Sequence, residues 1–197
     1  YQNVDVIFGT HNLHRLPEFL YSALIDGRRV CELSHTEGEV AEGLPVKRAS
    51  NWKAWVTIMY GCNNFCTYCI VPYVRGRERS RRRNDILQEI DALAAGGVRE
   101  ITLLGQNVNS YGKDLDEPER HESFAALLSA VCERTAGSSL RRIRFMTSHP
   151  KDLSEELIEV MAKYPSVCNQ LHLPVQSGST EILRRMNRRY TREQYIS

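Results

Sequence analysis

The fold of this chain is decided by the stretch Lys53-Ala-Trp-Val-Thr-Ile-Met59, which runs directly into Tyr60-Gly-Cys62-Asn-Asn-Phe-Cys66-Thr-Tyr-Cys69. The first part predicts a strand, with Val56 and Ile58 on one side. The second part places three cysteines in a C-x3-C-x2-C pattern. Three thiolates without a fourth suit a 4Fe–4S cluster in which one iron stays open to bind a small molecule.

Strand and helix patterns alternate over the rest of the chain. Strand-like runs cover 53–59, 98–104, 142–146 and 170–175, and helical periodicity covers 85–95, 124–133, 154–163 and 180–188. We expect Ser123 to cap the second of these helices, and Asp152 with Glu155 to form a capping box on the third. The alternation predicts an α/β fold with a parallel sheet and right-handed crossovers.

Polar, turn-rich segments follow each of the four predicted strands. They cover residues 60–62, 105–109, 147–150 and 174–179. Because functional groups in parallel sheets gather where the strands end, these segments are expected to meet on one rim. The chain ends after the fourth unit, so we expect about the first four βα units of a barrel.

A smaller unit precedes the barrel pattern. Strand-like runs at 4–8 and 29–33 flank a helical pattern that ends near Leu24. Residues 34–50 contain Gly, Glu and Pro without a period, which predicts a linker. The domains are therefore expected at 1–33 and 51–197, and the missing initial Met indicates a fragment of a longer protein.

Composition excludes several classes. The chain has 197 residues, 42% hydrophobic and 25% charged, with a net charge of +2. No apolar run reaches the ~18 residues needed to span a bilayer, and no signal peptide is present. We therefore expect a reduced, cytoplasmic protein without a membrane partner. Cys31, Cys132 and Cys168 lie scattered in apolar stretches and are expected to be buried.

Three alternatives compete with a cluster at the cysteine triad. A structural zinc site needs four ligands, and His149 and His172 would have to come from distant loops. The pair Cys66 and Cys69 has redox spacing but gives Cys62 no role. The third alternative is three buried cysteines in a loop.

The cysteine pattern, with aromatic Tyr68 just before the third cysteine, resembles the radical S-adenosylmethionine enzymes. In that family S-adenosylmethionine binds the open iron, and its reductive cleavage yields a 5′-deoxyadenosyl radical. The resemblance implies an incomplete radical-SAM barrel. It places Tyr68 against the adenine. It also implies that the polar groups of S-adenosylmethionine are bound by Gly105, Gln106, Asn107, Ser148, His149 and Gln176.

The flanking sequence resembles one branch of that family, the methylthiotransferases. The matching stretches are 52–62, 69–81, 104–112, 146–152 and 172–179, and 9–16 is similar to the end of the branch's N-terminal domain. The resemblance implies insertion of a methylthio group at C2 of N6-isopentenyladenosine, directly 3′ of the tRNA anticodon. A second 4Fe–4S cluster is implied in the full-length protein. Its three cysteines are absent here, so we expect this fragment to be unable to complete sulfur insertion.

A basic run follows the cysteines. Arginine forks pair with phosphates and Tyr73 can stack on a base, so tRNA is the expected partner. The proposed RNA contacts are Tyr73, Arg75, Arg77, Arg79 and Arg81. Solvated arginines, or arginines paired with the acidic run between Asp114 and Glu122, are the alternative. A second basic block, 184–192, reads as a helix face.

Other substrates and partners stay open at this point. Relatives in the same branch act on threonylcarbamoyl-adenosine in tRNA or on an aspartate of a ribosomal protein. A non-catalytic module that binds metal and RNA is the alternative from a different class. Flavodoxin or ferredoxin is the expected electron donor, and a monomer is the expected state.

Overall fold

The computed structural model describes residues 3–33, 40, 42–44, 46–116 and 122–197. The chain divides into two compact units, residues 1–46 and 47–197. The division falls inside the predicted 34–50 linker, of which residues 34–39, 41 and 45 lie outside the described part. Each unit has its own strands and helices, so each is described by itself.

The first unit is one βαβ turn. Strands β1 (Val6–Phe8) and β2 (Val30–Glu32) pair in parallel, joined by the 3-10 helix η1 (Thr10–Arg15) and helix α1 (Leu16–Leu24). Phe19 is the buried anchor of α1 and packs against Phe8 with ring centroids 5.7 Å apart. Cys31 in β2 is exposed, so the expectation that it is buried is wrong. Successive side chains of a strand point to opposite faces, and Cys31 lies on the exposed face whereas Val30 and Glu32 are half-buried on the other.

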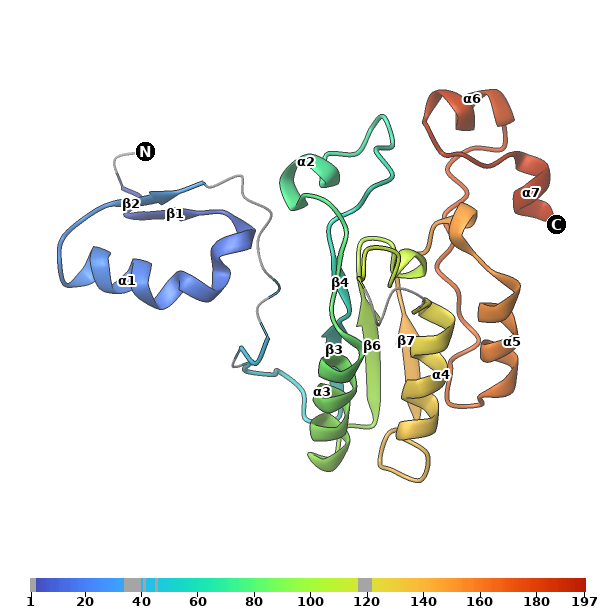
Figure 1. Cartoon of the computed structure of the whole chain (residues 1–197), viewed down its shortest axis with the longest axis horizontal. Coiled ribbons are helices and arrows are strands. Elements are labelled where there is room, and N and C mark those ends of the chain that lie inside the picture. Colours follow the sequence, from blue (N-terminus) through green and yellow to red (C-terminus); the bar gives the residue numbers. More distant parts are fainter. Residues whose placement is uncertain (1–2, 34–39, 41, 45, 117–121) are drawn as a thin grey trace. The chain divides into compact units, whose positions relative to one another are not determined.

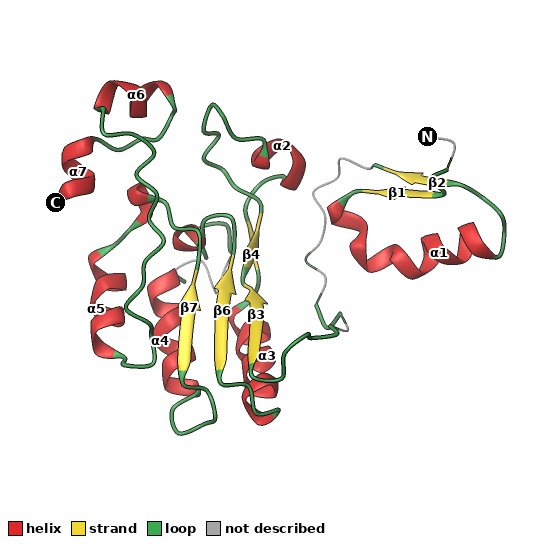
Figure 2. Cartoon of the chain, turned by 180° about the vertical axis from the view of Figure 1, so that it is seen from behind, coloured by secondary structure: helices red, strands yellow, loops and turns green. Residues whose placement is uncertain are grey.

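The second unit is built on a parallel sheet of order β3-β6-β7. The strands are β3 (Lys53–Thr57), β6 (Glu100–Leu104) and β7 (Arg142–Phe145). A short antiparallel pair, β4 (Met59–Tyr60) with β5 (Arg79–Ser80), continues from the end of β3. All three main strands end on the same edge of the sheet, as Figure 2 shows.

Helices cover one face of this sheet. The helices of the second unit are α2 (Val71–Arg75), α3 (Arg83–Ala95), α4 (Phe124–Arg134), α5 (Glu155–Lys163), α6 (Thr180–Arg185) and α7 (Arg192–Ile196), with 3-10 turns η2 (Val108–Ser110) and η3 (Pro150–Asp152). Helices α3 and α4 lie over β3, β6 and β7, as Figures 1 and 2 show from opposite sides. Between sheet and helices, Val56, Ile101, Ile143, Ile90 and Leu128 are completely buried. This core fixes where the strand ends lie, and so where the rim lies.

The opposite face of the sheet carries polar and charged side chains. Glu100 is buried in β6 and forms ion pairs with Lys53 of β3 at 3.3 Å and with Arg142 of β7 at 2.6 Å. Arg144 adds a third cation at 3.3 Å. Burial pushes the pKa of Glu100 upward, but these cations outweigh it and hold the pKa below its usual value. One carboxylate therefore connects all three strands.

Two local expectations are wrong. Residues 170–175 form no strand; the pairing with β7 is a single bridge at Val167, and Pro174 has no N–H to extend a ladder. The cap of α5 is Ser154, which accepts a hydrogen bond from the Leu157 N–H. Asp152 instead ends η3 and pairs with Lys151 of the same turn at 2.7 Å and with Lys113. Ser123 caps α4, as predicted.

No helix among the described residues is long and apolar enough to cross a membrane.

Candidate functional site

The cysteine loop, residues 61–70, follows β4 at the rim of the sheet. Cys62 and Cys66 are each 8% exposed and Cys69 is half-buried; all three are free thiols. Burial raises the pKa of the Cys62 thiol, and the charges of Glu78, Cys66 and Cys69 raise it further. The three thiols therefore lie close enough to influence one another electrostatically.

One carboxylate holds the first half of the cysteine loop. Glu78 accepts hydrogen bonds from the backbone N–H of Asn63 at 3.2 Å and from its side-chain amide at 3.4 Å. Ser110, in η2, donates its hydroxyl to the same carboxylate at 2.9 Å. Glu78 is 8% exposed. It thus ties the loop to the segment that follows β6.

The three thiols do not form a site for a single metal ion. Within the described part of the chain, no group of three His, Cys, Asp or Glu side chains is arranged to hold one ion. A 4Fe–4S cluster places each thiolate on a different iron, so it requires wider spacing than zinc does. Three thiols on one loop fit such a cluster, with one iron left for another ligand.

Close backbone packing joins the segments after β6 and β7. A Cβ on Gly105 would lie 2.6 Å from the Met59 Cγ, so a larger residue there would require the buried Met59 side chain to shift. Thr147 donates its hydroxyl to the Gly105 carbonyl at 2.5 Å and has a left-handed φ of +67°. The Val108 N–H donates to the Thr147 carbonyl at 3.0 Å. These contacts place the predicted residues of both segments on one rim.

The rim contains buried polar atoms without a partner. Among the described residues, those atoms include Gln106 Oε1, Asn107 Oδ1, Ser148 Oγ, His149 Nε2 and Arg188 Nε. A buried polar atom without a hydrogen bond costs about 1–3 kcal/mol, so pairing such atoms with a polar ligand or with water is favourable. The first four are residues that the sequence predicted for S-adenosylmethionine. The rim therefore fits a ligand that offers both donors and acceptors.

His149 is held as a neutral ring. Its Nδ1 accepts the backbone N–H of Lys151 at 3.2 Å, which leaves the proton on Nε2. The ring packs edge-on against Tyr190, with centroids 5.7 Å apart. Burial lowers the pKa of His149 to about 4, and the nearby charges of Arg188 and Lys151 contribute to the shift. His149 thus presents an N–H donor to the rim at neutral pH.

The remaining predicted cofactor residues are more open. Tyr68 is 53% exposed, with its hydroxyl 3.4 Å from Arg188 Nη1. Gln176 is exposed and has a φ of +68°. The described non-glycine residues with positive φ are Phe65 of the cysteine loop, Thr147 and Gln176, and Asn187 and Arg189 after α6. Such strain is typical of binding sites.

The sequence did not single out Arg188 as a site residue. It is 5% exposed, and its Nη1 lies 3.4 Å from the Cys66 Sγ. From the sequence it belongs to the basic block 184–192, which suggested a helix face. The contact joins residues 122 positions apart, and no local pattern signals it.

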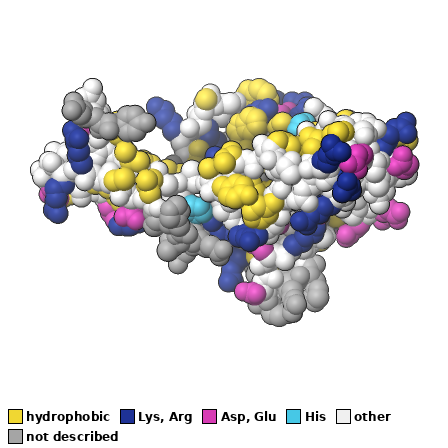
Figure 3. Space-filling model, turned by 90° about the horizontal axis from the view of Figure 1, so that it is seen from above, with side chains coloured by type: hydrophobic (Ala, Val, Ile, Leu, Met, Phe, Trp, Pro, Cys, Tyr) yellow, Lys and Arg dark blue, Asp and Glu magenta, His cyan; other side chains and the backbone are white. Residues whose placement is uncertain are grey.

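Four of the five predicted RNA contacts fall into two groups; the fifth, Arg79, is half-buried, and its Nη2 donates to the Arg75 carbonyl at 3.5 Å. Tyr73 is 73% exposed, and Arg75 and Arg77 are also exposed; Arg77 lies over the Phe65 ring at 4.9 Å. Arg81 is buried, with Nη1 2.7 Å from Glu89 and 2.6 Å from the Thr57 carbonyl. Seen from above in Figure 3, Lys and Arg side chains lie among apolar ones.

Two described residues of the acidic run, Asp114 and Glu122, already have partners. Asp114 accepts from the Ser80 N–H at 2.7 Å, and Glu122 pairs with Arg83 at 2.9 Å. The intervening residues 117–121 lie outside the described residues. Neither described contact involves Tyr73, Arg75 or Arg77.

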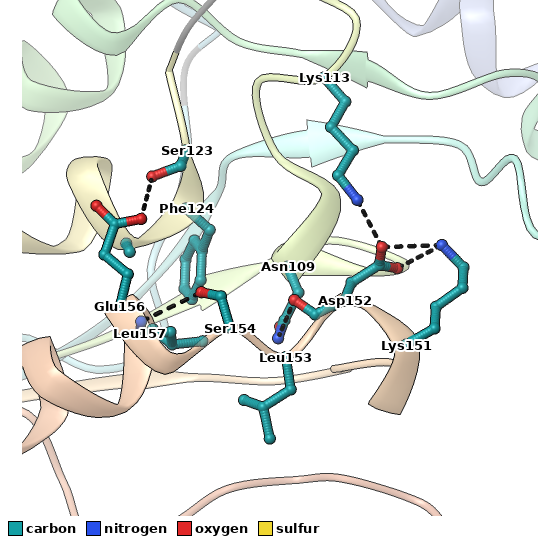
Figure 4. Close-up of a pocket in the computed structure, with 11 residues that line it drawn as sticks. Asn109, Lys113, Ser123, Phe124, Lys151, Asp152, Leu153, Ser154, Glu156 and Leu157 are labelled. Carbon is teal, nitrogen blue, oxygen red and sulfur yellow. Dashed lines mark hydrogen bonds and ion pairs between the residues drawn. The ribbon is translucent and has the colours of Figure 1, made fainter. Parts of the chain in front are cut away.

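A separate cavity of about 290 Å³ lies between η2, η3 and the first turns of α4 and α5. Figure 4 shows Asp152 there, engaged by Lys113 and Lys151. Its lining includes none of the predicted cofactor residues. Asp152 also accepts from the Asn107 amide at 2.7 Å, so it supports the rim from behind.

Similar sequences match nearly all of this chain. The chain is 58% identical over 197 residues to the tRNA-2-methylthio-N(6)-dimethylallyladenosine synthase of Carboxydothermus hydrogenoformans, covering all of this chain and 43% of that relative. The enzyme of the same name from Clostridium perfringens is 58% identical over 193 residues, covering 98% of this chain and 42% of the relative. The chain therefore spans about two fifths of the length of these relatives.

Two solved structures share the architecture. The radical S-adenosylmethionine methyltransferase TsrM from Kitasatospora setae matches 79% of this chain and 30% of its own, with a TM-score of 0.57 and 19% identity. The cobalamin-dependent S-adenosylmethionine radical enzyme OxsB matches 72% of this chain and 21% of its own, with a TM-score of 0.55 and 18% identity. The predicted partial barrel is confirmed. The profile of the radical SAM superfamily matches residues 56–197, and the chain belongs to that superfamily.

Proposed function

We propose that the protein containing this chain is a tRNA methylthiotransferase acting at C2 of N6-isopentenyladenosine next to the anticodon. The main support is the 58% identity over all 197 residues to a relative named for that product. The similarity in fold does not identify a substrate, because the solved structures are less than 25% identical to this chain in sequence.

Cys62, Cys66 and Cys69 are the proposed ligands of the 4Fe–4S cluster. When bound, the cluster supplies the electron for reductive cleavage of S-adenosylmethionine. The protein's own contribution is to orient that ligand. Its partners would be the unsatisfied polar atoms of Gln106, Asn107, Ser148 and His149 together with the exposed ring of Tyr68 and the segments at Gly105 and Gln176.

The proposed RNA surface consists of Tyr73, Arg75, Arg77 and Arg79. It directly follows the cysteine loop, and its guanidinium groups suit a phosphate backbone. Arg81 is left out, because its guanidinium is committed to Glu89 and the Thr57 carbonyl. The exposed aromatic Tyr73 can stack on an unpaired base of a loop.

The rest of the protein completes the proposal. Residues 1–33 would end the N-terminal methylthiotransferase domain, 34–50 would be a linker, and 51–197 would begin the radical SAM domain. A second 4Fe–4S cluster would be held outside this chain. We further propose a cytoplasmic monomer that receives electrons from flavodoxin or ferredoxin.

The decisive experiment expresses the full-length protein in a strain that makes isopentenyladenosine but not its methylthio derivative. Mass spectrometry of the tRNA nucleosides should then detect methylthio-isopentenyladenosine. Cys66→Ala should abolish it, whereas Cys31→Ala, at an exposed cysteine of the first unit, should not. A methylthio group on threonylcarbamoyl-adenosine instead would refute the substrate, and the absence of any methylthio nucleoside would refute the reaction.

The RNA surface is tested separately. Arg75→Ala with Arg77→Ala should weaken tRNA binding and reduce its salt dependence, because two phosphate contacts are lost. The matched control is Arg184→Ala, an exposed arginine paired with Glu181 at 2.9 Å. Equal weakening by the control would show a general charge effect.

A further inference from the structure

A distant segment closes over the cysteine loop. Residues 186–190 follow α6, and the side-chain amide of Asn187 donates to the carbonyls of Asn64 and Phe65, both at 3.0 Å. The Thr67 N–H donates to the Met186 carbonyl at 3.2 Å. Asn187 has a left-handed φ of +56°, which is the conformation that allows this approach. We call residues 186–190 the loop clamp.

The clamp places one guanidinium directly on a cysteine. Arg188 Nη1 lies 3.4 Å from the Cys66 Sγ and 3.4 Å from the Tyr68 hydroxyl. Its Nη2 donates to the Pro174 carbonyl at 3.4 Å, and the group lies over the Tyr190 ring at 5.5 Å. One side chain therefore connects the cysteine loop to the segment after the predicted fourth strand.

Arg188 is a buried cation that lacks a carboxylate. It is 5% exposed, and it takes part in no ion pair found among the described residues. Burying a charge without an opposite one is unfavourable by several kcal/mol. The neighbours on the page are a thiol, a phenol, a carbonyl and a ring, so the missing anion belongs on the cysteine side. A cluster held by three thiolates supplies negative charge there.

We propose that Arg188 is a positioning residue that donates a charge-assisted N–H···S hydrogen bond to Cys66 and thereby raises the reduction potential of the cluster. The inference rests on the proposed cluster ligands, and not on the proposed tRNA substrate. A donor at a ligating sulfur, and a positive charge beside it, stabilise the reduced cluster because that state carries one more negative charge.

The test uses the full-length protein with reconstituted clusters. Potentiometric titration followed by electron paramagnetic resonance gives the midpoint potential of the cluster whose signal changes when S-adenosylmethionine is added. Arg188→Gln should make reduction about tenfold less favourable, a shift of about 59 mV toward negative potential for one electron. Arg188→Lys keeps the positive charge but loses the planar guanidinium that donates several hydrogen bonds. Its midpoint potential should therefore lie between those of the wild type and Arg188→Gln.

Arg185→Gln is the matched control, since Arg185 is on α6, exposed and paired with Glu181 at 2.8 Å. It should leave the potential unchanged. The proposal is overturned if Arg188→Gln keeps its cluster and its potential, if the control shifts equally, or if only the affinity for S-adenosylmethionine changes. If Arg188→Gln does not bind the cluster, the midpoint potential is measured in Arg188→Lys instead. A wild-type potential in Arg188→Lys, or loss of the cluster in that variant too, overturns the proposed effect on the reduction potential.

The outcome is separable from the proposed function. A wild-type protein that has the responsive cluster but makes no methylthio nucleoside would refute the tRNA reaction. It would leave the comparison of potentials intact.

Discussion

Gly61 is the residue at which the chain turns from β4 into the cysteine loop. Its φ is +71°, and a Cβ there would lie 1.9 Å from the Arg77 carbonyl oxygen. Gly61→Ala should therefore cost at least about 1–2 kcal/mol of unfolding free energy, from the left-handed backbone alone, and should displace the loop. Iron bound per chain after reconstitution should fall, and urea unfolding gives the free energy.

Gly178→Ala is the control for that substitution. No atom lies within 4 Å of the position of its added Cβ, and its φ is not left-handed. It should keep wild-type stability and iron content. Equal iron loss in both variants would contradict the steric explanation.

His149 predicts how stability depends on pH. Its folded pKa of about 4 is below the usual 6.5, so the unfolded chain binds a proton in this interval that the folded chain does not. Stability from this group is therefore complete above pH 6.5 and falls as the pH drops toward 4, by at most about 3 kcal/mol. Protonation would also turn a donor on Nδ1 toward the Lys151 N–H.

His149→Asn keeps an acceptor for the Lys151 N–H but does not titrate. Urea unfolding at pH 6.5 and pH 4.5 should show a smaller loss of stability in this variant than in the wild type. The charged groups facing His149 are Arg188, Lys151, Asp152 and Arg189. A wild-type pH profile in the variant would mean that a group other than His149 sets the dependence.

Single residues differ in how far the sequence reveals them. Cys62, Cys66 and Cys69 are recognisable because their spacing is local, and Ser123 because a cap depends on three residues. Arg188 is not, because its environment is created by a contact across 122 residues. Local sequence patterns therefore predict cysteine ligands and helix caps, whereas the role of a buried charge depends on contacts that form only in the folded chain.

Among the elements, α5 shows how a cap is selected. Ser154 accepts the Leu157 N–H at 3.2 Å. Ser154→Ala should cost about 1 kcal/mol of unfolding free energy, because that N–H loses its partner. Glu155→Ala, which removes the side-chain acceptor of the predicted capping box, should cost less than Ser154→Ala, since that box is not formed. If thermal unfolding showed a larger loss of stability for the substitution at Glu155 than for Ser154→Ala, the predicted capping box would be supported after all.

The helices were predictable because their apolar periodicity agrees with their burial. Helix α3 was expected at 85–95 and spans Arg83–Ala95, and α4 was expected at 124–133 and spans Phe124–Arg134. The strand at 170–175 was wrong, because alternating Leu171, Leu173 and Val175 also suit an extended segment. Side chains hold that segment instead: Tyr190 and Tyr195 donate to the Val175 and Leu173 carbonyls.

For the whole molecule, the two units should unfold independently. The main core runs from Ala54 to Val167 and includes no residue of the first unit. Phe19→Ala should therefore speed amide hydrogen exchange in residues 3–33 and leave 47–197 unchanged. Truncating a buried Phe costs about 3–5 kcal/mol.

Leu20→Ala is the control for that experiment, since Leu20 is 43% exposed on the same helix. It should have little effect on exchange anywhere. Faster exchange in both units after Phe19→Ala would show that the units are energetically coupled.

The loop clamp also sets an order of events during synthesis. Asn187 binds the carbonyl of Asn64 across 123 positions of the chain. At about 5–20 residues per second, a ribosome needs roughly 6–25 s to make that span. Until then the cysteine loop has only its contacts with nearer parts of the chain, such as those of Asn63 with Glu78 and of the Cys62 N–H with the Gly76 carbonyl. Cluster delivery to the nascent chain would thus meet an open loop before Arg188 is made, and the burial of Cys66 beneath Arg188 cannot precede the synthesis of residues 186–190.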